Sequence, residues 1–156
     1  MPWEFRQLHR VEFAETDLAG IMHFSNFFRF MERTEHAFHR SLGFSIHMEV
    51  EELKIGWPRV HASCDYKRPV RFEDELEVQL LVREKRARSV TYEFIFRKIG
   101  EAEEVARGRM TAVCVSMEAD AHGERTIRAV PIPEVIAARL EVAPAEALAA
   151  GAGEAP

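Results

Sequence analysis

The sequence predicts an α+β fold in which one long helix precedes a run of antiparallel strands. Three observations support this prediction. Apolar residues recur at helical spacing over residues 25–42, later segments alternate apolar and polar residues, and the loops between those segments are short and polar. A helix followed by a block of strands is typical of segregated α+β folds, because a doubly wound sheet alternates the two kinds of element.

The first predicted strand covers residues 9–13, and a loop with the sequence ETDLAGIMHF follows at residues 15–24. The helix over residues 25–42 has about five turns. We expect Ser25 or Asn26 as its N-cap and Gly43 as its stop. A broad apolar face predicts deep packing against a sheet; its residues are Phe27, Phe28, Met31, Phe38 and Leu42, widened by Phe24, Phe30 and Ala37.

The remaining segments are mostly strands with a period of two, which indicates half-buried strands. Residues 45–53 show no clear periodicity, and a short helix is one interpretation of them. The predicted strands cover residues 59–66, a run from residue 75, a run containing Tyr92, Phe94 and Phe96, and residues 107–117. A turn at 120–124 precedes a short strand and a terminal helix within residues 126–140. Residues 1–142 are therefore expected to form one domain, and the small residues of 143–156 a disordered tail.

Composition limits the function classes. A chain of 156 residues with 47% hydrophobic and 30% charged residues fits one ordinary globular domain. No apolar run approaches the ~20 residues that span a bilayer, and no signal peptide is visible, so we expect a cytoplasmic protein without membrane contact. The net charge of −5 argues against general nucleic-acid binding.

The cysteine and histidine spacing predicts neither a disulfide framework nor a metal site. Cys64 and Cys114 lie far apart in apolar stretches, which indicates reduced core thiols. Asp and His residues lack ligand spacing, so no metal and no cofactor are expected.

Asp17 is the first candidate for chemistry. Gly20 permits a tight turn, and the helix that begins near Phe24 presents unpaired amides and a positive dipole end. An oxyanion formed from a carbonyl is stabilised at such a place, and a nearby carboxylate suits acyl transfer as nucleophile or general base. The alternative is that Asp17 only caps the turn or the helix. His23 is more often a packing or hydrogen-bonded residue than a catalytic one.

Residues 11–27, VEFAETDLAGIMHFSNF, resemble the hot-dog-fold thioesterases of the 4-hydroxybenzoyl-CoA thioesterase family. The shared pattern is an aspartate, two residues, a glycine, two aliphatic residues and an aromatic pair, followed by Asn within the long helix. Residues 65–74 look like that family's strand with a proline before an acidic turn, and residues 124–135 like its closing strand and helix. The resemblance covers residues 8–140.

The resemblance implies a hot-dog fold, in which a curved antiparallel sheet of about five strands wraps one long central helix. It also implies homodimers joined edge to edge, often paired into homotetramers, with an acyl-CoA or aroyl-CoA thioester bound at the subunit interface. By position, Asp17 is the catalytic carboxylate and the Phe24 amide holds the thioester carbonyl.

The chain also departs from the family pattern. Many bacterial relatives carry a histidine seven positions after the aspartate, where this chain has Phe24, and His23 stands one position earlier. Adjacent residues on a helix point about 100° apart, so His23 does not simply inherit that role. The 4-hydroxybenzoyl-specific branch has aromatics at both positions. Benzoyl-like, naphthoyl-like and aliphatic acyl groups therefore all remain open.

A basic hairpin is the candidate site for the CoA phosphates. It contains Arg83, Lys85, Arg86, Arg88 and the following Ser89, in a region where relatives bind those phosphates. A solvated turn is the equally weighted alternative. Lys67, with Arg68 and Arg71, forms a second candidate patch. The predicted CoA-binding residues are Arg86, Arg88, Ser89 and Lys67.

Two other functions compete with thioester hydrolysis. A hot-dog hydratase or dehydratase needs a histidine paired with an acid, and His23 and His61 are the candidates. A non-catalytic acyl-CoA-binding module would keep the fold without turnover.

Overall fold

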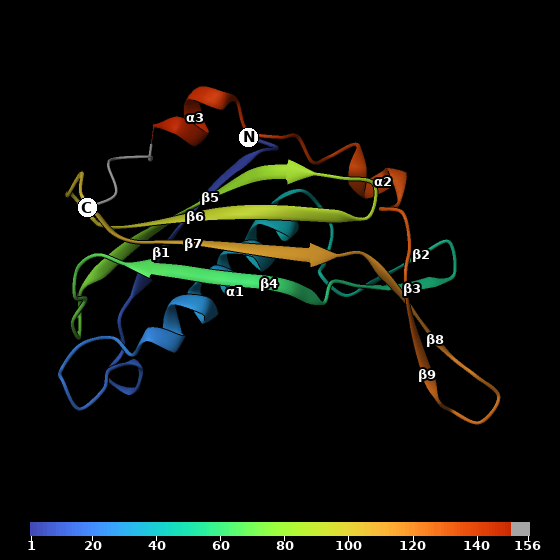
Figure 1. Cartoon of the computed structure of the whole chain (residues 1–156), viewed down its shortest axis with the longest axis horizontal. Helices are drawn as coiled ribbons and strands as arrows, with labels where there is room; N and C mark the ends of the chain where they lie inside the picture. Colours follow the sequence, from blue (N-terminus) through green and yellow to red (C-terminus); the bar gives the residue numbers. More distant parts are fainter. Residues whose placement is uncertain (151–156) are drawn as a thin grey trace.

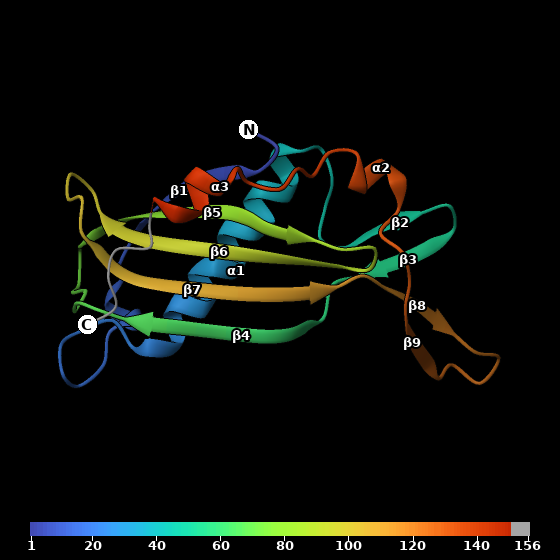
Figure 2. The same cartoon turned by 45° about the horizontal axis from the view of Figure 1, so that its top comes forward.

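A five-stranded antiparallel sheet packed against one 18-residue helix forms the body of the protein, in a computed structural model that describes residues 1–150. The strand order is β1-β5-β6-β7-β4, with β1 and β4 at the edges. Figures 1 and 2 show the helix α1 crossing one face of this sheet. The bounds are β1 (Glu4–Arg10), α1 (Phe24–Ser41), β4 (Arg59–Tyr66), β5 (Glu75–Lys85), β6 (Ser89–Lys98) and β7 (Glu104–Val113).

The hydrophobic core lies between α1 and the inner face of the sheet. Phe30 and Phe38 of α1 are fully buried, as are Tyr92 and Phe94 of β6. The rings of Phe38 and Tyr92 meet edge to face at 6.4 Å between centroids. The alternating pattern of β6 and the broad apolar face of the helix both predict this packing.

A smaller sheet extends the fold beyond the C-terminal end of α1. It has the order β2-β3-β8-β9, and Figure 1 shows its β8–β9 hairpin projecting away from the body. Its strands are β2 (Met48–Val50), β3 (Leu53–Gly56), β8 (Val115–Ala119) and β9 (Arg125–Ala129). The short helices are η1 (Phe13–Glu15), α2 (Glu134–Ala137) and α3 (Ala145–Ala149). None of the helices within residues 1–150 has the length and apolar content needed to cross a bilayer.

The predicted helix over 25–42 is confirmed to within one residue at each end, but the predicted N-cap is wrong. His23 is the N-cap, and its Nδ1 accepts a hydrogen bond from the Ser25 amide at 3.3 Å. The stop at Gly43 agrees with its φ of +86°, a conformation that favours glycine.

Two strand predictions and one helix prediction need correction. The first strand, β1, starts at Glu4 instead of His9 and ends at Arg10 instead of Phe13, where η1 begins. Residues 45–53 contain β2 and the start of β3 rather than a helix, because β2 pairs with β3 in an antiparallel hairpin. Ile55 and Gly56 of β3 then pair with β8. The expected strand over 107–117 is divided between β7 and β8 at Cys114, whose amide donates to the Arg88 carbonyl at 2.7 Å.

Residues 143–150, expected to be part of a disordered tail, instead contain α3 and pack on the outer face of the sheet. Ala143 is buried against Leu81 and Ile95, and Leu148 packs against the same cluster. The Ala143 amide donates to the Val82 carbonyl at 2.8 Å. Leu81 and Ile95 are apolar residues on an otherwise polar sheet face, and their contacts with Ala143 and Leu148 explain why this segment packs there. The rest of the predicted tail, residues 151–156, lies outside the described residues.

Candidate active site

A cleft of about 400 Å³ lies at the N-terminal end of α1. The loop before α1, the first turn of α1 and the segment that follows β4 form its walls. Its lining residues include Asp17, Phe24, Phe27, Tyr66, Lys67 and Arg68. The structure therefore brings the predicted Asp17 and Phe24 together in one cleft with Lys67.

The loop that carries Asp17 is fixed by its own backbone. The Asp17 amide donates to the Ile21 carbonyl and the Gly20 amide donates to the Asp17 carbonyl, both at 2.9 Å. Gly20 has a φ of +76°, which explains the glycine at this turn. The Met22 amide donates to the Val70 carbonyl at 2.6 Å, which joins the loop to the opposite wall of the cleft.

The Asp17 carboxylate is half-buried and has one oxygen committed. Its Oδ1 accepts a hydrogen bond from the Ala19 amide at 2.9 Å, so the alternative role as a turn cap is present in the structure. Among the hydrogen bonds of residues 1–150, none uses Oδ2. The turn thus orients the carboxylate while leaving one oxygen for a ligand in the cleft.

The helix start has one unpaired backbone donor, on a residue that lines the same cleft as Asp17. The Ser25 amide donates to His23 Nδ1, and the Asn26 amide donates to the His23 carbonyl at 2.9 Å. No hydrogen bond within the described part of the chain uses the Phe24 amide. This amide lies at the positive end of the α1 dipole, where negative charge is stabilised.

His23 serves the helix rather than the cleft. Its Nδ1 contacts the Ser25 hydroxyl at 2.8 Å as well as the Ser25 amide, and its ring packs on Phe24 at 4.5 Å between centroids. It does not line the cleft. His61, the other candidate for hydratase chemistry, is an exposed residue of β4 and does not line the cleft either.

Tyr66 is a cleft residue that the sequence did not single out. Its hydroxyl donates to the Phe24 carbonyl at 3.1 Å, and its ring meets Phe27 edge to face at 5.0 Å. Burial is the main cause that raises the Tyr66 pKa to about 12, and the neighbouring Cys64 raises it further. A neutral hydroxyl at working pH therefore holds the first turn of α1. No sequence signal marks it, because the contact depends on where β4 ends.

The predicted CoA-binding residues are divided between two ends of the molecule. Lys67 lines the cleft and pairs with Glu104 at 2.8 Å, but Arg86, Arg88 and Ser89 lie at the β5–β6 turn. Figure 1 shows that turn and the loop before α1 at opposite ends of the sheet. At roughly 3.3 Å per residue, the length of β5 separates them, so the hairpin does not reach the cleft of its own chain.

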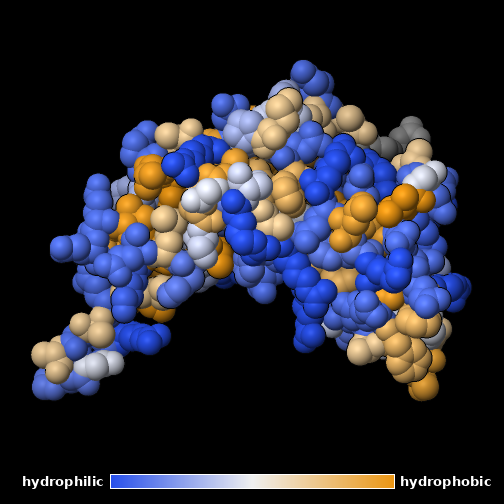
Figure 3. Space-filling model, turned by 180° about the vertical axis from the view of Figure 1, so that it is seen from behind, coloured by the Kyte–Doolittle hydropathy of each residue, from blue (hydrophilic) through white to orange (hydrophobic). Residues whose placement is uncertain are grey.

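Hydrophobic side chains are exposed around the mouth of the cleft. Leu18 and Phe24 are mostly exposed, and Phe13 packs on the exposed Phe72. Figure 3 shows hydrophobic surface at this end of the molecule, at lower right, over the loop that precedes α1. An exposed apolar rim around a cleft is typical of a surface that meets a ligand or another protein.

One long helix packed on an antiparallel sheet, with a carboxylate cleft at the helix start, defines a hot-dog thioesterase. The family model of the thioesterase-like superfamily matches residues 11–140. The chain therefore belongs to that superfamily, and it is a thioester hydrolase.

Named relatives agree with this assignment. A protein of Aquifex aeolicus (strain VF5) named "Putative esterase" is 36% identical over 98 residues, which cover 63% of this chain and 74% of the relative. The 1,4-dihydroxy-2-naphthoyl-CoA hydrolase of Prochlorococcus marinus (strain NATL2A) is 30% identical over 108 residues, 64% of this chain and 70% of the relative. The solved structure of a gentisyl-coenzyme A thioesterase is 30% identical, with a TM-score of 0.70, and the match covers 87% of this chain and 98% of that one.

Proposed function

We propose that the protein hydrolyses the thioester bond of an aroyl-CoA in the cleft at the start of α1. The observation that supports this most directly is the pairing of the Asp17 carboxylate with the unpartnered Phe24 amide in one cleft. The Asp17 carboxylate attacks the thioester or activates water, and the Phe24 amide donates a hydrogen bond to the negatively charged carbonyl oxygen.

The reaction has two routes that use the same residues. In the first, Asp17 removes a proton from water, the hydroxide adds to the thioester carbon, and the oxyanion accepts a hydrogen bond from the Phe24 amide. Collapse breaks the C–S bond, and the proton passes from Asp17 to the CoA thiolate. In the second, the Asp17 carboxylate adds to the carbon and expels the thiolate, and water then hydrolyses the mixed anhydride.

Aromatic walls support an aromatic acyl group. Phe24, Phe27 and Tyr66 line the cleft, and aromatic rings favour offset or edge-to-face contact with another ring. The relatives named above act on a dihydroxynaphthoyl-CoA and a gentisyl-CoA. Lys67 and Arg68 at the cleft retain donors beyond their ion pairs with Glu104 and Glu103, so they suit phosphate oxygens of CoA.

A second copy of the chain is part of this proposal. Strand β4 is an edge strand, and most of its side chains are exposed, including Val60. Two β4 strands that pair antiparallel would place the end of one sheet beside the opposite end of the other. The basic β5–β6 turn of one subunit then lies at the same end as the cleft of its partner, which agrees with a CoA-binding role for Arg86, Arg88 and Ser89.

The activity test is thiol release from a panel of aroyl- and acyl-CoA esters by wild type and Asp17→Asn. We expect aromatic esters to be the best substrates and the variant to lose at least about 100-fold in kcat. Asp120→Asn is a matched control, because the Asp120 carboxylate also accepts turn amides, those of His122 and Glu124, but on the distant β8–β9 hairpin.

Three results would contradict the proposal. Asp17→Asn retaining the wild-type rate removes the role of the carboxylate. Tight binding of CoA esters without turnover indicates a binding module. Water addition to an enoyl-CoA, followed by ultraviolet absorbance, indicates a hydratase.

Single-turnover hydrolysis in ¹⁸O water separates the two routes. Water attack on the thioester places ¹⁸O in the acid released in the first turnover. Attack by Asp17, followed by attack of water on the Asp17 carbonyl carbon of the anhydride, instead leaves an unlabelled carboxylate oxygen in the acid and places ¹⁸O in Asp17. Sedimentation of wild type and Val60→Glu tests the assembly. We expect wild type to sediment as a dimer or tetramer and the variant to shift toward monomer, and a monomeric wild type would contradict the β4 pairing.

A further inference from the structure

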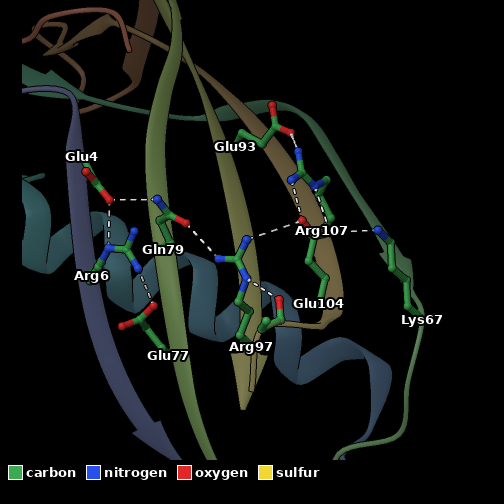
Figure 4. A network of polar contacts seen from close by, with 10 residues as sticks. Glu4, Arg6, Lys67, Glu77, Gln79, Glu93, Arg97, Glu104 and Arg107 are labelled. Atoms are coloured by element: carbon green, nitrogen blue, oxygen red, sulfur yellow. Dashed lines mark hydrogen bonds and ion pairs between the residues drawn. The ribbon is translucent and has the colours of Figure 1, made fainter. Parts of the chain in front are cut away.

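The face of the sheet turned away from α1 carries a network of charged residues. Strand alternation points Tyr92 and Phe94 toward the core, so Thr91 and Glu93 point to the other side. Figure 4 shows part of this network, with the drawn side chains on one side of the strands and α1 on the other. Glu93 is its centre, and it is 1% exposed although it lies on the outer face.

Three arginines converge on the single Glu93 carboxylate. Arg83 pairs with its Oε2 at 2.5 Å, Arg107 pairs with its Oε1, and Arg109 approaches Oε2 at 3.7 Å. Arg83 stands at a β-bulge, where the register of β5 against β6 shifts between Val82 and Glu84. A bulge redirects a side chain, which explains how this residue reaches Glu93.

The network has more positive than negative charges. Glu104 neutralises part of Arg107 but is shared with Lys67 and Arg97. Five cations therefore face the two carboxylates of Glu93 and Glu104. With Asp65, which stands opposite Arg107 on β4, and with Arg6, Glu4 and Glu77, which are joined to Arg97 through Gln79, six cations face five carboxylates, so an excess of one positive charge remains. This excess is notable on a protein whose net charge is −5.

An open cavity of about 400 Å³ lies over this positive surface. Its lining residues are Arg83, Glu84, Thr91, Arg109 and Leu148. Glu84 is already paired with Arg86 at 3.0 Å, so it does not cancel the two arginines. The cavity volume lies within the range of small-molecule sites.

The cavity has unused hydrogen-bond donors. A guanidinium has five N–H donors; Arg83 uses Nη1 on Glu93, and no hydrogen bond within residues 1–150 uses the Arg109 guanidinium. The hydroxyls of Thr91 and Thr111 are 2.9 Å apart. One hydroxyl donates to the other, which leaves the second hydroxyl hydrogen free.

We propose that this cavity, the outer-face pocket, binds the phosphate group of a small molecule between Arg83 and Arg109. Planar guanidinium groups and a hydroxyl donor suit tetrahedral oxyanions, and Leu148 of α3 offers an apolar wall for the organic part of the ligand. The phosphate comes either from the nucleotide part of a CoA or from a free phosphorylated compound. The pocket lies on the sheet face opposite to α1, so the inference does not rest on the proposed hydrolysis.

Isothermal titration calorimetry of the full chain with inorganic pyrophosphate and with adenosine 3′,5′-bisphosphate tests this site. We expect at least one probe to bind, with an affinity that weakens as ionic strength rises. Arg109→Gln should weaken that binding at least about tenfold, because one charge-assisted contact is lost. Thr91→Val should weaken it to a smaller extent.

Arg6→Gln is the matched control, because Arg6 lies on the same sheet face with 47% of its side chain exposed, against 46% for Arg109, and does not line the pocket. It should bind the probe as wild type does. Binding of the bisphosphate without pyrophosphate assigns the nucleotide source. Pyrophosphate binding that is at least as tight as that of the bisphosphate shows that the adenosine part adds no affinity, and it assigns a free phosphorylated ligand. No binding of either probe at 50 mM salt, or equal binding by wild type and Arg109→Gln, would overturn the proposal.

Discussion

Glu35 makes the folding stability depend on pH in a direction that can be worked out from its surroundings. Its side chain on α1 is fully buried and forms a two-pronged ion pair with Arg59 at the start of β4. Burial is the largest influence and raises the Glu35 pKa to about 7, although Arg59 acts to lower it. Removing this carboxylic proton in the folded protein therefore requires a higher pH than in the unfolded chain.

The sign and size follow from this difference. Between pH 4.5 and about 7 the folded protein keeps a proton on Glu35 that the unfolded chain has lost. The contribution of Glu35 to the free energy of unfolding therefore falls as the pH rises through this interval. At about 1.4 kcal/mol per pKa unit, the loss amounts to about 3 kcal/mol. A domain of this size then loses roughly 10 °C in Tm.

The assay compares wild type with Glu35→Gln by urea unfolding at several pH values from 5 to 8. Glutamine keeps the shape and an acceptor for Arg59 but does not titrate. The two proteins are compared because other groups also make the free energy of unfolding depend on pH. Burial lowers the pKa of His9 to about 4 and of His39 to about 3. Because these histidines stay neutral in the folded protein, they lower its stability as the pH falls below the ordinary histidine pKa, which opposes the Glu35 effect.

We expect wild type to lose stability relative to Glu35→Gln by about 3 kcal/mol between pH 5 and pH 8. A difference that stays constant within about 0.5 kcal/mol over this range refutes the reasoning, since it means that Glu35 titrates alike in both states.

Three further substitutions have outcomes set by local geometry. Gly20→Ala forces a side chain into a φ of +76° with open space around it, so we expect a loss of about 1 kcal/mol in urea unfolding and slower thioester hydrolysis. In Gly108→Ala the new Cβ would lie 2.0 Å from Met31 Cε, so Tm should fall and Met31→Ala should partly restore it; an additive double variant would contradict the clash. Tyr66→Phe removes the hydrogen bond to the Phe24 carbonyl, and we expect kcat to fall about fivefold with a Tm change of only a few degrees.

The long helix was predictable because its signal is local and strong. Apolar residues at helical spacing over five turns leave one arrangement that buries Phe30 and Phe38. The N-cap was not predictable in the same way, because Ser25 and Asn26 are both common caps. The Asn26 side chain instead donates to the Glu15 carbonyl at 2.8 Å, an interaction with the preceding loop that takes it away from the helix end.

The cleft was predictable only where its residues are close in sequence. Asp17, Gly20 and Phe24 lie within eight positions, so one turn and one helix start bring them together. Tyr66 and Lys67 reach the same cleft only because β4 ends there, and that depends on how β4 pairs with β7. The spacing of residues along the chain does not predict where β4 ends.

The outer-face pocket shows how one pattern determines two faces of a sheet. The inner face places Tyr92 opposite Met110, both buried, and this same register places Glu93 opposite Arg109 on the outer face. A slip of one residue would expose the apolar set and separate the charges, so core burial fixes the charge cluster as well. The alternation in β5, β6 and β7 alone predicts solvated charges on that face. Their convergence on one buried carboxylate requires the register and the bulge at Arg83, which only the folded sheet defines.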